Sequence, residues 1–159
     1  MKIRPVILCG GAGTRLWPNQ ENTQAKQFIN FGNWTLFGKT LDRVKNSLFD
    51  SPIISTNEKY LNDVKKHLKE KKIKKFKIIL EPIKKNTAPG ILSTALIKDI
   101  PENQPLVFFS SDHFIEKTYQ FYNSIKLHEK HLNDRNIFIF GIKPFTPSSE
   151  FGYFLSKKG

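Results

Sequence analysis

Short apolar runs alternate with amphipathic segments along most of this 159-residue chain, and this alternation constrains the fold more than any other feature. The apolar runs are typical of buried strands, and the segments between them carry apolar residues at helical spacing. Strands that alternate with helices indicate an α/β fold with a mainly parallel sheet. Strands are predicted at 3–9, 52–56, 75–81, 105–110 and 136–142, and helices from about residue 35 and at 58–71, 87–98 and 116–133.

The net charge limits the classes of partner. It is formally +12, and the lysines are densest between residues 65 and 77. A lysine-rich solvated surface is the simplest explanation, although such a charge could also meet an anionic small molecule. No window approaches the ~18 apolar residues of a membrane helix, and the N-terminal apolar run is too short for a signal peptide. We therefore expect a cytoplasmic protein that binds neither a membrane nor a nucleic acid.

The chain has a single cysteine, Cys9, at the end of the first predicted strand. One cysteine cannot form an intrachain disulfide, and no Cys/His spacing indicates a zinc site. Both observations fit a reducing compartment. We expect Cys9 to be a buried, small apolar side chain.

A glycine-rich loop directly follows the first predicted strand. Gly10, Gly11 and Gly13 let the backbone approach a ligand without interference from Cβ atoms, and clustered N–H groups of this kind bind anions. Arg15 adds a planar fork of donors suited to phosphate oxygens, and Lys26 could add a point charge. The loop therefore predicts a phosphate-binding site.

Two better-known phosphate loops do not match this sequence. A Walker A loop requires Gly-Lys-Ser/Thr, whereas this loop continues with Thr14-Arg15. A dinucleotide-binding fingerprint that starts at Gly11 requires glycine or alanine at position 16, where Leu16 stands.

The loop resembles a known signature instead. The pattern Gly-Gly-x-Gly-Thr-Arg-Leu-Trp-Pro at residues 10–18, followed by Lys26-Gln27-Phe28, is similar to that of the sugar-nucleotide pyrophosphorylases, and in particular to their mannose-1-phosphate guanylyltransferase branch. Ala25 departs from the proline that the family usually has before the lysine. The resemblance implies a Rossmann-like, GT-A-type three-layer nucleotidyltransferase domain. Residues 1–159 would form the N-terminal portion of that catalytic domain, truncated at its C-terminal end.

A second segment, at residues 81–89, resembles the family's Glu-Pro-x-x-Arg-Asn-Thr-Ala-Pro. A strand end, a turn and a helix N-terminus suit either a helix cap or a site that holds an anion or a base. The resemblance assigns Glu81, Asn86 and Thr87 to the guanosine end of the substrate. Lys85 stands where the family has arginine, so the charge is kept but the fork of donors is lost.

A third segment, Ser110-Ser111-Asp112-His113, follows the fourth predicted strand. A carboxylate at this end of a parallel strand faces the crevice where α/β sheets bind ligands, although Asp112 could instead cap the next helix. Mg²⁺ prefers one or two carboxylates together with substrate oxygens. The family's Ser-Asp-His segment implies that Asp112 holds Mg²⁺ and that His113 lines the site.

A fourth segment, Gly141-Ile142-Lys143-Pro144 with Gly152-Tyr153 after it, resembles the family's sugar-site segments. Glu150 and Phe151 replace residues that are usually glycine and tyrosine there. The resemblance gives Gly152 and Tyr153 a sugar-binding role.

Taken together, the resemblance implies transfer of GMP from GTP to mannose 1-phosphate, which gives GDP-mannose and pyrophosphate. Arg15, Lys26 and Asp112 would be catalytic. The implied substrate-binding residues are Leu8, Gly10, Gly11, Gly13, Thr14, Glu81, Asn86, Thr87, Ser111, His113, Gly152 and Tyr153.

Several alternatives stay open. The family's catalytic domain is longer than this chain and supplies a second metal-binding aspartate further on, so the 159 residues alone are expected to be weakly active or inactive. The other readings are a pyrophosphorylase for another sugar or base, a nucleotide-binding fragment without activity, and a nucleic-acid binder suggested only by the charge. A homodimer is possible but not indicated by any feature of the sequence.

Overall fold

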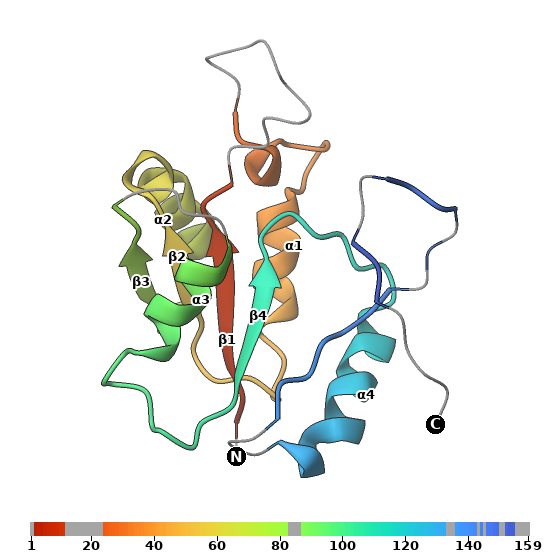
Figure 1. The fold of residues 1–159 in the computed structure, drawn as a ribbon. Helices are drawn as coiled ribbons and strands as arrows, with labels where there is room; N and C mark the ends of the chain where they lie inside the picture. The colour runs from red at the N-terminus through yellow and green to blue at the C-terminus, as the bar shows by residue number, and fades with distance from the viewer. Residues whose placement is uncertain are drawn as a thin grey trace.

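Four parallel strands form one sheet in the order β3-β2-β1-β4 (Figure 1). The structure is a computed structural model that describes residues 2–11, 24–82, 87–132, 136–142, 144, 146–149 and 152–154. The strands are β1 (Arg4–Cys9), β2 (Ile53–Thr56), β3 (Lys77–Leu80) and β4 (Leu106–Ser110). The first strand in sequence therefore lies inside the sheet, between β2 and β4.

Helices cover both faces of this sheet, so the domain has three layers. In Figure 1, α3 crosses in front of the sheet, whereas α1 and α2 lie behind it. None of the described helices is long and apolar enough to cross a membrane. The helices are α1 (Leu36–Arg43), α2 (Leu61–Glu70), α3 (Thr87–Ala95) and α4 (Thr118–His128), and the short 3-10 turns are η1 (Lys26–Phe28), η2 (Glu58–Tyr60) and η3 (Glu129–His131).

Alternate residues of β1 point to opposite layers, as the period of a strand requires. Ile7 and Cys9 are fully buried in the core cluster that also contains residues of α1, α2 and α4. Leu8 points to the other face, because a methyl group added at Gly90 of α3 would lie 3.5 Å from Leu8 Cδ2. The residue that ends β1 on the α3 side is therefore close to the helix that follows the Glu81 segment.

The start of α1 is fixed by its cap. Thr35 has an extended backbone, and its side-chain oxygen accepts a 2.9 Å hydrogen bond from the backbone N–H of Gly38. The cap satisfies one of the donors that the first turn of a helix leaves unpaired.

We predict that Thr35→Ala lowers the free energy of unfolding by about 1 kcal/mol, because alanine cannot accept this hydrogen bond. Urea denaturation of both proteins measures the difference. Thr35→Ser keeps the hydroxyl and is the matched control. An equal loss in the serine variant would assign the effect to packing of the threonine methyl group instead of the cap.

The prediction of a fifth strand at residues 136–142 is wrong. This segment forms no strand, and Ile137 and Ile142 are 92% and 83% exposed. It lies along α4, where the Phe140 ring is 6.1 Å from that of Phe121. The apolar alternation indicates a strand, but a strand also needs a partner, and β4 pairs with β1 alone among the described residues.

Helix ends also differ from the predictions. The helix predicted at 116–133 is α4, which stops at His128 and continues only as the turn η3. The helix predicted at 87–98 stops at Ala95. The helix predicted from about residue 35, with apolar spacing as far as Leu48, is α1 and stops at Arg43. The other strands and helices agree with the predicted ranges to within three residues.

Candidate functional site

The carboxyl ends of the four strands meet along one edge of the sheet, which is the upper edge in Figure 1. Gly10 follows β1, Asn57 follows β2, Glu81 follows β3 and Ser111 follows β4. Ligands of open α/β sheets bind outside this edge. The described parts of three of the resembling segments, which begin at Gly10, Glu81 and Ser110, therefore lie at this edge.

Lys26 and Asp112 meet at this edge, although 86 residues separate them in the sequence. Lys26 Nζ lies 3.8 Å from Asp112 Oδ2, and the two side chains are 37% and 34% exposed. The Ser110 hydroxyl donates a hydrogen bond to Asp112 Oδ1 and orients the carboxylate. An ion pair as long and as exposed as this contributes little to stability, so both charges remain available to a ligand.

The backbone beneath this pair is fixed by sheet hydrogen bonds. The Ser111 N–H donates to the Leu8 carbonyl at 3.1 Å, which extends the β1–β4 ladder by one residue. The side chain of Ser111 is buried, whereas that of His113 is exposed. The backbone just before Asp112 is therefore held beside the end of β1.

Gln27 is a site residue to which the sequence analysis gave no role. Its side chain is buried, and its Nε2 donates to the Gly11 carbonyl at 3.1 Å and lies 3.9 Å from Cys9 Sγ. Gln27 thus fastens the beginning of the glycine loop to η1, the turn that carries Lys26. The signal was present, because Gln27 is the central residue of the Lys-Gln-Phe motif.

Cys9 agrees with the prediction of a buried side chain. It has no exposed surface, and burial raises the pKa of its thiol to about 12. The thiol therefore stays protonated at neutral pH and is no nucleophile, since only the thiolate attacks.

Two hydrogen bonds hold Glu81 at the end of β3, one through its backbone and one through its carboxylate. Its backbone N–H donates to the Thr56 carbonyl at 2.7 Å, and the Ser55 hydroxyl donates to Glu81 Oε1 at 2.5 Å. A methyl group added at Gly90 would lie 3.1 Å from Oε1, and one added at Gly10 would lie 3.4 Å from Oε2. Glycine at both positions therefore leaves room for this carboxylate.

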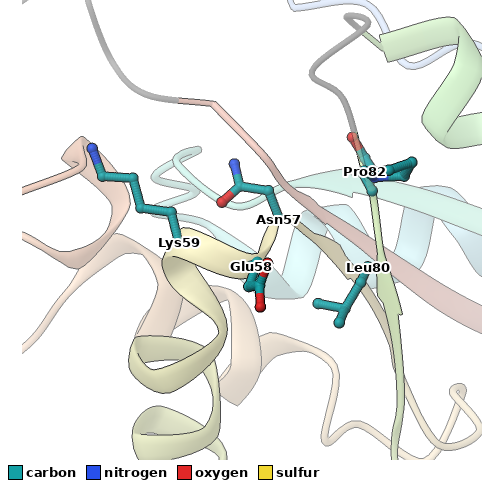
Figure 2. Close-up of a pocket in the computed structure, with 6 residues that line it drawn as sticks. Asn57, Glu58, Lys59, Leu80 and Pro82 are labelled. Carbon is teal, nitrogen blue, oxygen red and sulfur yellow. The ribbon is translucent and has the colours of Figure 1, made fainter.

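A cavity of about 520 Å³ opens next to Glu81 (Figure 2). It is lined by Asn57, Glu58, Lys59, Leu80, Glu81 and Pro82, which follow or end β2 and β3. Lys26 and Asp112 do not line it. The described part of the site therefore has a cavity end at Glu81 and a charged end at Asp112, on either side of the end of β1.

Arg43 is a second residue that the sequence analysis missed. Its side chain is buried, with the residue only 3% exposed, and the guanidinium donates to the His113 carbonyl at 3.1 Å. Burial lowers the pKa of Arg43, but a guanidinium remains charged in proteins. Arg43 thus holds the segment that follows Asp112. The sequence did carry a signal for its burial, because Arg43 stands seven residues after Leu36 and so lies on the same, buried face of α1.

The remaining predicted site residues are either outside the described residues or exposed. Gly13, Thr14, Arg15 and Asn86 lie outside the described residues. Thr87 begins α3 and is exposed. Gly152 is also exposed, and Tyr153, 53% exposed, exchanges hydrogen bonds with the backbone of Ser148 at 2.7 and 2.9 Å.

The described residues contain no cluster of three or more histidine, cysteine, aspartate or glutamate side chains that could hold a metal by itself. Asp112 is a single carboxylate with partly exposed oxygens. A site of this type suits a cation that takes most of its ligands from a substrate or from water, as Mg²⁺ does.

Solved structures confirm the fold. The chain matches the crystal structure of mannose-6-phosphate isomerase from Helicobacter pylori with a TM-score of 0.61 and 29% identity, over 82% of this chain and 46% of that one. It also matches a glucose-1-phosphate thymidylyltransferase from Bacillus anthracis with a TM-score of 0.62 and 19% identity, over 80% of this chain and 51% of that one.

Sequence relatives point to one family. The mannose-1-phosphate guanylyltransferase of Salmonella montevideo is 34% identical over 152 residues, which are 95% of this chain and 32% of that protein. One from Escherichia coli is 36% identical over 153 residues, 94% of this chain and 33% of that protein. The chain therefore spans about a third of these relatives. Because the nucleotidyl transferase family model matches residues 4–158, the chain belongs to the nucleotidyl transferase family.

Proposed function

We propose that this chain is the N-terminal, nucleotide-binding portion of a mannose-1-phosphate guanylyltransferase, which transfers GMP from GTP to mannose 1-phosphate and releases pyrophosphate. The observation that carries the proposal is the meeting of Lys26 and Asp112 at the carboxyl edge of the sheet, beside the start of the glycine loop. The 34–36% identity to enzymes with this name supports the choice of sugar and base.

The reaction requires little covalent chemistry from the protein. The attacking oxygen of a sugar phosphate is already an anion, so no serine, cysteine or histidine nucleophile is needed, and Cys9 is protonated in any case. The residues would align the two phosphates and neutralise their charge. In this proposal the Gly10–Thr14 amides and Arg15 bind the triphosphate, and Lys26 faces the same phosphates.

Asp112 is the residue that would hold Mg²⁺. Its Oδ1 accepts from Ser110 and its Oδ2 is near Lys26, so a cation there would displace only a weak ion pair. Bound Mg²⁺ would neutralise phosphate charge that Lys26 and Arg15 cannot cover alone. Glu81 and Thr87 would face the guanosine, and Gly152 and Tyr153 keep their proposed role at the sugar.

A release assay for pyrophosphate tests the function. The full chain is incubated with mannose 1-phosphate, a magnesium salt and GTP, ATP, UTP or dTTP in parallel, and nucleotide binding is measured by calorimetry. We expect magnesium-dependent binding with GTP preferred, and slow pyrophosphate release because the chain spans a third of its relatives. Binding without release would favour the alternative of an inactive nucleotide-binding fragment, and preference for another nucleotide would contradict the guanylyl assignment.

A further inference from the structure

Asn57 has a carboxamide that the fold itself does not use. The residue stands at the N-cap position of η2, with an extended backbone, yet its side chain makes no capping hydrogen bond. Its Oδ1 is buried and has no hydrogen-bond partner within the part of the chain that the structure describes. An unsatisfied buried acceptor costs about 1–3 kcal/mol, so this side chain is not explained by stability.

The position of Asn57 beside a cavity explains its unpaired carboxamide oxygen better than stability does. The residue lines the same cavity as Glu81, at the end of the neighbouring strand. In Figure 2 its carboxamide points away from the side chains of Glu58 and Leu80. The terminal torsion of asparagine is soft, so rotation about it is the movement by which Oδ1 would reach a ligand in the cavity.

The cavity is therefore lined by two residues that can accept hydrogen bonds. An ionised Glu81 carboxylate can only accept hydrogen bonds, and Asn57 Oδ1 accepts as well. The pairing edge of guanine presents donors, the N1–H and the 2-amino group, whereas adenine presents an acceptor at N1. A volume of about 520 Å³ is within the range of small-molecule sites.

We propose that Asn57 is a specificity-determining residue that accepts a hydrogen bond from the 2-amino group of guanine, next to Glu81. The inference rests on the proposed function, because it names the group that reads the base in that site. Ser55 is part of the same arrangement, since its hydroxyl donates to Glu81 Oε1 and keeps the carboxylate turned toward α3.

The test compares GTP with inosine triphosphate, which differs only by lacking the 2-amino group. Dissociation constants of both nucleotides are measured by calorimetry, with magnesium, for the unmodified chain and for Asn57→Ala. We expect the unmodified chain to prefer GTP. In Asn57→Ala the affinity for GTP should fall about five- to tenfold, the effect of one lost hydrogen bond, while the affinity for inosine triphosphate stays within about twofold.

Asn62→Ala is the matched control, because it makes the same chemical change at an exposed position on α2. It should leave both dissociation constants unchanged. Equal weakening of both nucleotides in Asn57→Ala would indicate a structural role and would overturn the inference, as would an unchanged ratio. In either case the guanylyl function would stand, whereas failure of the unmodified chain to bind GTP would refute that function itself.

Discussion

Asp112→Asn is expected to weaken the binding of Mg²⁺ to the GTP complex of this chain at least about a hundredfold. Loss of an outer-shell partner alone typically lowers metal affinity 10–100-fold, and Asp112 is proposed as a direct ligand. Asparagine keeps the shape of the side chain but removes the charge that a hard cation prefers. Calorimetric titration of magnesium into the protein–GTP mixture measures the change.

The same substitution should leave the fold almost untouched. The ion pair between Lys26 and Asp112 is 3.8 Å long and about one-third exposed at both ends, so its removal should change the free energy of unfolding by less than about 1 kcal/mol. Asp50→Asn is the matched control. Asp50 also forms an ion pair, with Arg4, but it precedes β2 and so lies at the opposite edge of the sheet. Unaltered magnesium binding in Asp112→Asn would rule out its role as a ligand.

The arrival of Asp112 and Glu81 at one edge of the sheet could be anticipated from the sequence for a simple reason. The alternation of strands and helices predicts a parallel sheet, and in such a sheet every strand that is followed by a crossover helix ends at the same edge. Residues directly after strands, such as Asp112 and Glu81, are therefore predicted to lie at the same edge without any knowledge of the strand order. The order itself, with β1 between β2 and β4, was not predictable from periodicity.

The incorrect and missing predictions concern features that depend on contacts between segments far apart in the sequence. The run at 136–142 has the composition of a strand, but periodicity does not say which edge receives it, and the segment lies beside α4 instead. Arg43 was overlooked because a charged residue is expected on the solvated face of a helix. Asn57 was overlooked because nothing in the sequence shows that its side chain makes no capping hydrogen bond at the start of η2.

Phe37→Ala is expected to have the largest effect on stability, with a loss of about 3–5 kcal/mol in the free energy of unfolding. Phe37 is fully buried in α1, and its ring contacts Phe28 edge-on at 5.5 Å and His67 at the same centroid distance. Removing the ring leaves a cavity between α1, α2 and η1 that these elements can fill only by moving. Since small domains are stable by only 5–15 kcal/mol, urea unfolding should start at much lower concentration.

This substitution should also weaken nucleotide binding, because Phe37 supports the turn that carries the charged end of the site. Phe28 ends η1, and Lys26 and Gln27 are the other two residues of that turn. A loosened η1 would release the hydrogen bond from Gln27 to the Gly11 carbonyl and would let Lys26 move away from Asp112. Phe76→Ala is the control, since Phe76 is 41% exposed beyond α2 and should affect neither property by more than about 1 kcal/mol. The folded fraction of Phe37→Ala could instead bind GTP with unchanged affinity. That result would contradict the support of η1 by Phe37 and would leave the glycine loop to position this turn.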